Sequence, residues 1–484
     1  METIKECWIY KVDFNFIYHT MSDSLFLKNT LESADQIFYD IKLTGLTVDT
    51  IKKISADQQE PQWMLDHRLQ SLELFQSMSM PSRWPDLSGL DLDQIVRYAK
   101  PSQNQPHAQS WDQVDPAIKE KFRRLGIPEA EQKYLAGAGG QYDSEVVYHK
   151  IKEKRAQKGV IFEDMSMAVR THADLVRKYF MKLVPTRDHK FAALHGAVRS
   201  GGTFIYVPKG VQVTEPLQAY FRMNTYGGGQ FEHTLIVIDD DARGDYIEWC
   251  SAPKYDRKSL HTGLVEIFVG KNSQMRYSSV ENRSTNTYNL NTKRAIVDDY
   301  GFMERVNGNL WSCTTMLYPC TILKWHHSKG DMLGIAVAWS NQNQDTGSKI
   351  IHIGHHTSST IVSKSLSKDW GISTYRGLVD IKSTANHAVN STECDALLFD
   401  GSSISTTIPH IQVNNSTATV AHEASAGKID DTQMFYMMSR GIAEEKAMAM
   451  IVNGFFSPIV KKLPLEYAWE LNRLIELEME WSVW

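Results

Sequence analysis

Three residues late in the chain, Cys394, His422 and Glu423, have side chains of the kinds that can bind iron. Thiolate, imidazole and carboxylate groups can together ligate this metal. His422 and Glu423 follow Cys394 by 28 and 29 positions, a plausible length for one coil of a β-solenoid. Adjacent residues on a strand point to opposite faces, so both can reach one ion only where the strand ends or bulges. The A-S-A-G that follows permits this, although residue statistics favour ordinary polar roles for all three.

Other chemistry-bearing residues give weaker signals. Cys313 and Cys320 lack the spacing of a structural zinc pair and are expected to be small buried hydrophobes. The pairs His326–His327 and His355–His356 are weak metal candidates, because adjacent strand residues face opposite ways. The sequence has no Walker loop, no G-x-S-x-G, no H-E-x-x-H and no C-x-x-C. The A-G-A-G-G at 136–140 lacks a preceding apolar strand, which excludes a dinucleotide fingerprint.

Composition narrows the class of protein. The 484 residues correspond to roughly three domains at about 150 residues each. Hydrophobic residues make up 42% and charged residues 23%, and no apolar run approaches the length of a membrane span, so no membrane role is expected. A net charge of −5 gives no support for nucleic-acid binding. Five widely spaced cysteines and no secretory signal pattern predict a reducing compartment, the cytoplasm.

The elements that must position these residues divide the chain into four parts. Residues 1–20 are expected to be a non-native upstream stretch, with Met21 as the natural start, or else a docking arm. Residues 21–195 are expected to form a helical domain, which includes an amphipathic helix over 62–78. Residues 196–428 contain short β-rich runs separated by Asn, Ser and Gly turns, and predict a sandwich, a barrel or, preferably, a β-solenoid.

Residues 429–484 predict a return to helix. Asp430 or Asp431 can cap a helix that runs through Ser439 and ends at Gly441. A second helix is expected over 443–456, with Pro458 breaking it, and a third over 464–481. Their apolar faces suit packing against the β domain or docking of a partner.

A series of long sequence islands resembles the SufB/SufD family of the Suf iron–sulfur cluster assembly system, over everything after about residue 55. The islands include G-G-T-F-I-Y-V-P-K-G-V (201–211), Y-F-R-M-N (220–224), Y-I-E-W-C-S-A-P (246–253), D-T-G-S-K-I-I-H-I-G (345–354), Y-R-G-L-V (375–379), T-E-C-D-A-L (392–397), H-E-A (422–424) and M-I-V-N-G-F (450–455). The resemblance implies a mainly β fold, a right-handed parallel β-helix flanked by helical terminal regions.

The same resemblance implies a non-enzymatic scaffold that works with the ABC-type ATPase SufC, with SufD or a second SufB, with a sulfur donor protein, and with apo iron–sulfur proteins as recipients. The ATPase would dock on the C-terminal helices. A nascent, labile iron–sulfur cluster is the implied cofactor, and a flavin has no support in the sequence. Alternatives are a SufD-like structural subunit, less favoured because Cys394 and Glu423 are both present, and a carbohydrate-active β-helix enzyme.

Site roles follow from the family motifs. Cys394 matches the cluster-site cysteine, with His422 and Glu423 beside it. Cys250 matches the cysteine that receives sulfur, and the residues matching the route through the β-helix interior are Arg222, Asn224 and Lys293. V-E-N-R at 280–283 departs from the common V-Q-N-W and places Glu281 and Arg283 in that route.

Overall fold

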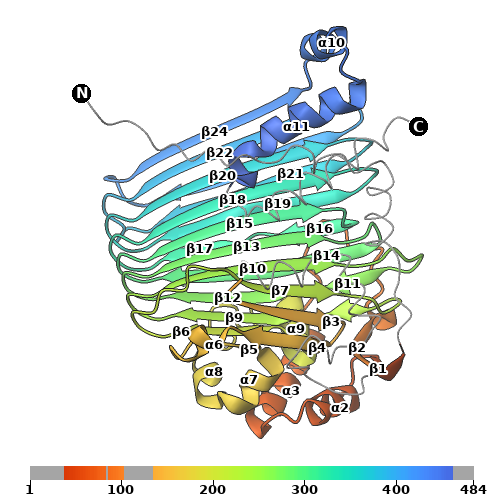
Figure 1. Cartoon of the computed structure of the whole chain (residues 1–484), viewed down its shortest axis with the longest axis vertical. Coiled ribbons are helices and arrows are strands. Elements are labelled where there is room, and N and C mark those ends of the chain that lie inside the picture. The colour runs from red at the N-terminus through yellow and green to blue at the C-terminus, as the bar shows by residue number, and fades with distance from the viewer. Residues whose placement is uncertain (1–37, 83–84, 103–134, 462–484) are drawn as a thin grey trace.

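The computed structural model describes residues 38–82, 85–102 and 135–461, and its core is a parallel β-solenoid built from two sheets (Figure 1). The expectations for residues 1–20, for Met21 and for a helix over 464–481 concern residues outside these ranges. The first sheet contains β3 (Gly137–Tyr142), β4 (Glu145–Ile151), β7 (Leu217–Arg222), β10 (Arg243–Ser251), β13 (Gln274–Asn282), β15 (Phe302–Leu310), β18 (Lys329–Ala338), β20 (Ser358–Ser367), β22 (Val389–Leu398) and β24 (Thr419–Lys428).

The second sheet faces the first across the interior. It contains β5 (Ile161–Asp164), β6 (Thr203–Val207), β8 (Gly229–Gln230), β9 (His233–Ile238), β11 (Ser259–His261), β12 (Leu264–Val269), β14 (Thr287–Val297), β16 (Thr314–Leu317), β17 (Cys320–Leu323), β19 (Asn343–His352), β21 (Ile372–Ile381) and β23 (Ile404–Val413). From β18 onward, successive strands alternate between the two sheets, so each coil contributes one strand to each. The solenoid prediction is confirmed.

Strand alternation explains how the sequence forms this core. In β22, Asn390, Thr392 and Cys394 are buried in the interior, while the residues between them point outward. The inward positions of both sheets form one apolar cluster that includes Ile236, Val265 and Ile361. Inward residues therefore stack from coil to coil, and a residue and its neighbour on the next coil are typically 28 to 31 positions apart.

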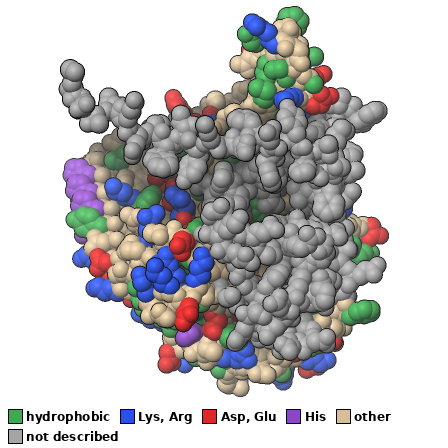
Figure 2. Space-filling view, viewed as in Figure 1, with side chains coloured by type: hydrophobic (Ala, Val, Ile, Leu, Met, Phe, Trp, Pro, Cys, Tyr) green, Lys and Arg blue, Asp and Glu red, His purple; other side chains and the backbone are tan. Residues whose placement is uncertain are grey.

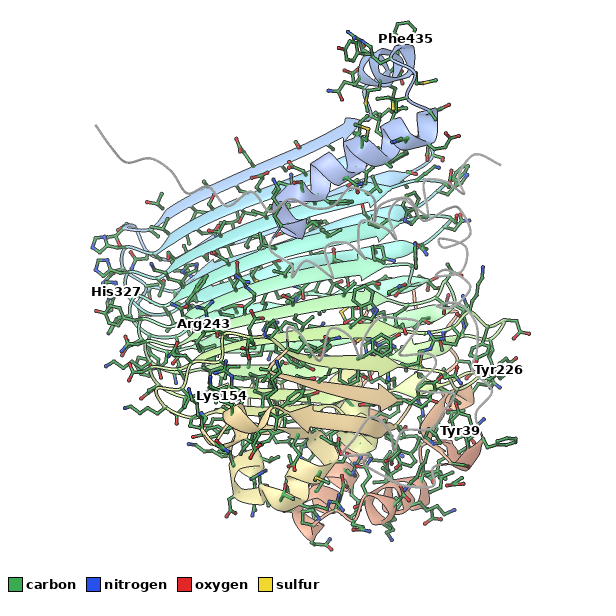
Figure 3. All side chains as sticks on the ribbon, in the orientation of Figure 1. Tyr39, Lys154, Tyr226, Arg243, His327 and Phe435 are labelled. Carbon is green, nitrogen blue, oxygen red and sulfur yellow. The ribbon has the colours of Figure 1, made fainter. Side chains whose placement is uncertain are left out.

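One corner of the solenoid carries a row of stacked rings, the histidine ladder. Tyr300, His327, His356 and His387 follow one another on successive coils, with ring centroids 4.7, 5.0 and 4.9 Å apart. All four have positive φ, between 54° and 56°, because the same left-handed turn recurs on each coil. The histidine pairs are thus turn residues, and they form a purple patch at one edge of Figure 2, where Figure 3 labels His327.

The region between 38 and 195 differs from the expected helical domain because it also contains strands. β1 (Tyr39–Thr44) pairs with β2 (Val96–Pro101), and β3, β4 and β5 extend the solenoid sheets, β4 and β5 by antiparallel pairing. The glycine-rich 136–140 stretch lies mostly in β3, which is buried throughout. Short strands that pair with distant partners leave no local periodicity, whereas the helix expected over 62–78 is confirmed as α3 (Gln62–Ser77).

Helices cover the outer faces of the sheets. The N-terminal ones are α2 (Val48–Asp57), α3, α6 (Glu153–Ala156), α7 (Met165–Thr171), α8 (Ala173–Tyr179), α9 (Lys190–Val198) and the 3₁₀ turn η2 (Leu92–Gln94). α7, α8 and α9 pack on the second sheet through apolar contacts with β9 and β12. No helix in the described ranges is both long and apolar enough to cross a membrane.

Two helices follow β24 at the other end. α10 (Asp431–Ser439) begins where the Asp430 carboxylate accepts the Thr432 N–H at 2.9 Å, as expected. α11 (Glu444–Val460) continues through Pro458, so the expected break there was wrong. The proline has no N–H to donate to the carbonyl of Gly454, but Ile459 and Val460 beyond it are buried against the first sheet, and this packing holds the last turn in helical form. α10 projects beyond the solenoid, with Phe435 at its tip (Figure 3).

Candidate functional site

Cys250 lies inside the solenoid, in the middle of its polar interior. It belongs to β10, in which Tyr246, Glu248 and Cys250 share the inward face, and its side chain is fully buried. Its register partner on the next coil is Glu281 of β13. A cysteine at this position is therefore surrounded by residues from several coils that are far apart in the sequence.

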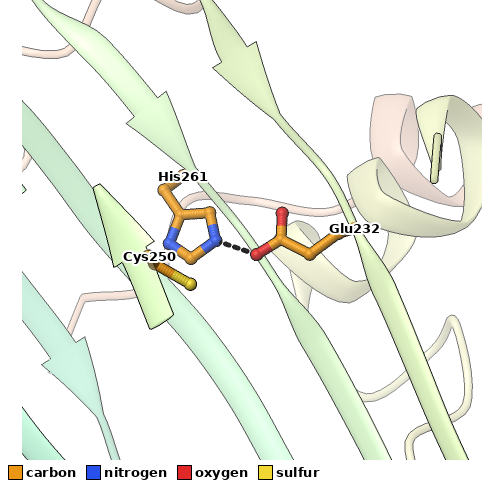
Figure 4. Close-up of side chains that lie close together, drawn as sticks. All are labelled: Glu232, Cys250 and His261. Atoms are coloured by element: carbon orange, nitrogen blue, oxygen red, sulfur yellow. Dashed lines mark hydrogen bonds and ion pairs between the residues drawn. The ribbon is translucent and has the colours of Figure 1, made fainter. Parts of the chain in front are cut away.

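Two sets of ionisable groups meet at Cys250 Sγ. A carboxylate oxygen of Glu232, a ring nitrogen of His261 and Cys250 Sγ all lie within 4.8 Å of one another (Figure 4), and the same holds for Glu248, Cys250 and Glu281. His261 Nε2 also contacts the Glu232 carboxylate directly, while its Nδ1 lies 2.6 Å from Asn289 Oδ1. Sulfur, imidazole and carboxylate ligands in this arrangement could hold a metal ion.

Cations balance part of this negative charge. Lys293 Nζ donates to Glu281 Oε1 at 2.9 Å and lies 3.8 Å from Glu248 Oε1. Burial opposes ionisation of Glu281, but Lys293, His261 and Arg283 outweigh it and lower its pKa to about 2. Burial raises the pKa of Glu248, and Lys293 opposes that rise. Glu281 and Arg283, the two departures noted in the family motif, thus form part of one charge-balanced cluster.

The Cys250 thiol is protonated at neutral pH in this setting. Burial, followed by the nearby charge of Glu281, raises its pKa well above the usual value, and Arg283 opposes that effect. Because the thiolate is the reactive form, Cys250 needs a base or a change of surroundings before it can act as a nucleophile.

Of the three residues matched to the sulfur route, the structure brings Lys293 to Cys250. Arg222 ends β7 next to Phe221, the register partner of Cys250, and its Nη1 donates to Ser251 Oγ at 3.1 Å. Since neighbouring strand residues face opposite ways, this contact lies on the other face of the first sheet. Asn224 lies beyond the strand end, where its N–H donates to the Asp143 carboxylate at 2.7 Å.

Cys394 lies in the same interior, nearer the other end. It is 4% exposed and belongs to the interior apolar cluster. Burial raises its pKa to about 12, and the hydroxyl of Tyr375 acts in the opposite direction. Five strand steps separate β10 from β22 along the first sheet. At about 4.8 Å each, the two cysteines are about 24 Å apart, too far for direct reaction.

His422 and Glu423 lie on β24, the last strand of the first sheet. The register pairs His422 with Thr392 and Glu423 with Glu393. His422 therefore shares the inward face with Cys394, and its Nε2 is buried without a hydrogen-bond partner among the described residues. Glu423 is exposed on the outward face. β24 pairs without a bulge through Lys428, so the expected convergence of all three ligands within one chain is wrong, and the ligand assignment itself stays a prediction.

Sequence reasoning missed Glu232, Glu248 and His261. Each is an unremarkable residue in its own segment, and only the coiling of the chain brings it to Cys250. The only signal in the sequence was that each residue occupies an inward position on a strand. That signal identifies neighbours only when the register between coils is known.

Comparisons with known proteins agree with this geometry. Residues 221–455 match the family model described as the SufBD core domain of SUF-system FeS cluster assembly, and residues 141–219 match the SufBD N-terminal region. The chain is 50% identical over 439 residues to iron-sulfur cluster assembly protein SufB of Bacillus subtilis, covering 91% of this chain and 94% of that protein. An iron-sulfur cluster assembly SufBD family protein of Staphylococcus epidermidis is 51% identical over the same shares. The chain therefore belongs to the SufB/SufD family of iron–sulfur cluster assembly proteins.

Proposed function

We propose that this protein is the SufB-type scaffold on which iron and sulfide combine into a cluster for transfer to apo-proteins. The observation that carries the proposal is the inward thiol of Cys394, one coil below the open end of the first sheet, with His422 beside it on the terminal strand. A cluster held partly by imidazole and carboxylate would leave more readily than one held by four thiolates, which suits a scaffold.

The open end supports a second chain as part of the cluster site. β23 and β24 are the terminal strands of the described sheets, and β23 is exposed along nearly its whole length. Glu423 faces away from Cys394, so one chain supplies an incomplete ligand set. We propose that SufD or a second copy covers this end and completes the set.

The interior offers a path between the two cysteines. Following the hydrogen-bonded register from β10 to β22, one inward row reads Glu248, Ser279, Asn307, Gly334, Ser363 and Cys394, which we call the interior row. Four of these six positions carry small or amide side chains, so the row has no large side chain between Glu248 and Cys394. Cys250, two residues beyond Glu248, would receive sulfur from the donor protein, and the sulfur would move along this row.

The C-terminal helices support docking of the ATPase SufC, which would supply the nucleotide chemistry that this sequence lacks. α11 is an unsuitable docking face, because Val452 and Phe456 are buried against the first sheet. α10 instead exposes Phe435 at 74% and Tyr436 at 57%. We place the docking surface on α10, which lies within the C-terminal helical region 429–484 expected to dock the ATPase; the helix expected over 464–481 lies outside the described residues.

The SufD-like structural subunit remains the second candidate, because Cys394 is nearly sealed and Glu423 points away from it. Anaerobic reconstitution separates the two. With ferrous iron and inorganic sulfide, a scaffold should develop visible charge-transfer absorption that Cys394→Ser loses and Cys313→Ser keeps. Cys250→Ser should also keep it, because free sulfide bypasses the donor route. Wild-type protein that develops no absorption, alone or with its partner chains, would favour the structural subunit.

Docking is tested on the full complex. Phe435→Asp should lower co-purification of SufC at least about tenfold, since a buried aromatic anchor typically contributes 2 kcal/mol or more. Trp370→Asp is the matched control, because Trp370 is an equally exposed aromatic (66%) at a solenoid corner. Equal loss in both variants, or in neither, would remove α10 from the proposal.

A further inference from the structure

Arg305 is a buried cation inside the solenoid that has no counter-ion among the residues that the structure describes. It lies on β15, in register between Tyr277 and Met332, and its side chain faces inward beside Asn307 of the interior row. The residue is 0% exposed. Its guanidinium carbon lies 5.7 Å from the centroid of the Tyr277 ring. The charge is therefore held in the core, two strands beyond Cys250 in the direction of Cys394.

Within the described ranges, the guanidinium has no hydrogen-bond acceptor. Nε, Nη1 and Nη2 are all buried and unpartnered, and in the described part of the chain no other arginine has all three nitrogens in that state. Buried Arg68 and Arg199 differ, because both contact Glu60. Burial lowers the pKa of Arg305 to about 10, and the groups that oppose this are Tyr277 and Cys320, with no carboxylate among them. A buried charge left unpaired is strongly unfavourable, so its retention calls for a ligand.

Two features of neighbouring strands suit a bound ion. Thr321 follows Cys320 on β17 of the facing sheet, and its buried hydroxyl also lacks a partner among the described residues. Gly334 lies one coil further along the interior row, and a Cβ added there would meet nothing closer than Ser363 Oγ at 3.9 Å. The missing side chain of Gly334 therefore leaves space in the interior row one coil beyond Asn307.

We propose that Arg305 is the base of a buried site for a small monovalent anion of hydrosulfide size, between Cys250 and Cys394. Five donor hydrogens on a fixed plane suit a single anion, and the apolar surroundings strengthen that contact. The existence of the site rests on Arg305 alone, whereas identifying the anion as a sulfur species rests on the proposed function.

Hydrosulfide bound at this site would carry sulfur between Cys250 and Cys394, which are too far apart to react directly. Hydrosulfide attacks the terminal sulfur of a Cys250 persulfide, Cys–S–SH: a new S–S bond forms, the Cys250 S–S bond breaks, and the Cys250 sulfur keeps that electron pair and takes up the proton that the new HS–SH releases. The hydrodisulfide, HS–S⁻, then takes the proton of the Cys394 thiol to give HS–SH, and the Cys394 thiolate attacks one of its sulfurs, which forms a Cys394 persulfide and releases hydrosulfide. Atoms and electrons balance, and no reductant is consumed.

The anion site is tested with bromide on the full-length protein. Crystals soaked in bromide should show an anomalous peak at hydrogen-bonding distance from the Arg305 guanidinium, and crystals of Arg305→Met should lack it. Arg305→Met should fold with an unchanged or higher thermal unfolding midpoint, because an apolar side chain replaces an unpaired charge. Bromide bound elsewhere on wild-type crystals but absent from Arg305 would overturn the proposal.

The sulfur role is tested by peptide mass spectrometry. Protein carrying a Cys250 persulfide, freed of excess polysulfide, is given hydrosulfide, and the alkylated persulfides at Cys250 and Cys394 are quantified. Arg305→Met should lower transfer to Cys394 about tenfold or more, the loss typical of removing hydrogen bonds to a charged group, and Arg305→Lys should lower it less. Equal transfer in Arg305→Met and wild type would overturn the carrier role. A bromide peak with no transfer in wild type would instead overturn the sulfur route and leave the anion site standing.

Discussion

Removing the Lys293 cation should expose how much of the fold depends on the charge balance around Cys250. In Lys293→Met, Glu281 loses its 2.9 Å partner and Glu248 its 3.8 Å partner. Breaking a buried pair by removing one partner typically costs about 3–5 kcal/mol. Glu248 can take up a proton, since burial already raises its pKa, and Glu281 retains Arg283 and His261, each at 3.7 Å. We therefore expect Lys293→Met to lower the free energy of unfolding by about 3 kcal/mol, the low end of that range.

Urea unfolding followed by tryptophan fluorescence measures this loss. Lys382→Met is the control, because Lys382 has a 2.6 Å contact with Asp380 but is 46% exposed, and such pairs contribute at most about 1 kcal/mol. The double variant Lys293→Met with Glu281→Gln should recover most of the lost stability. If Lys293→Met is no less stable than Lys382→Met, the cluster is not the charge-balanced unit described above.

The pH dependence of stability tests independently whether ionised Glu281 stabilises the fold. Glu281 has a folded-state pKa of about 2, below its usual 4.5, so its ionised form stabilises the fold at neutral pH. That contribution is lost as the pH falls from about 4.5 towards 2. Without Lys293 the folded-state pKa rises, so the loss should begin at higher pH.

Two further outcomes are expected. Iodoacetamide at pH 7.5 should label Cys313 at least about tenfold faster than Cys250 or Cys394. Cys313 is only partly buried, whereas burial raises the pKa of the other two thiols. Equal labelling rates would contradict this reasoning. Partial desolvation and the neighbouring imidazoles lower the pKa of His356 from 6.5. Protonation of His356 is therefore less favourable in the folded state than in the unfolded state. Protection of the backbone amides of residues 353–358 from hydrogen exchange should fall as the pH drops below about 6.5. Hydrogen exchange, corrected for the pH dependence of the intrinsic rates, measures this loss of protection, and His356→Asn should make the loss smaller. Protection that does not change with pH in the wild type would contradict the prediction.

Local sequence patterns were sufficient to predict much of the fold but little of the candidate site. Short strands with Asn, Ser and Thr at the turns predicted the solenoid, and Asp430 predicted the start of α10. The strands of the N-terminal region escaped notice because β3 consists largely of small residues and pairs with β7, far along the chain. Alternation on β24 correctly placed His422 and Glu423 on opposite faces, and the bulge invoked to reunite them does not form.

The Cys250 cluster and Arg305 could not be predicted, because they depend on which residues align between coils. One position of slip in register would move every inward side chain outward. That alignment is set by coil lengths, and no local pattern reports it. The family motifs identified Cys250 and Lys293, but the partners that determine their charge states are visible only after the chain has coiled.

The two ends of the solenoid differ in a way that affects how the protein must be made. At one end, the antiparallel strands β4 and β5 terminate the sheets and helices surround them, whereas β23 and β24 present unpaired edges in the described structure. Such edges are templates for fibrous growth. If a partner chain covers that end as proposed, synthesis of this protein in excess of its partner would favour end-to-end polymers, and matched expression of the two chains would keep the protein soluble.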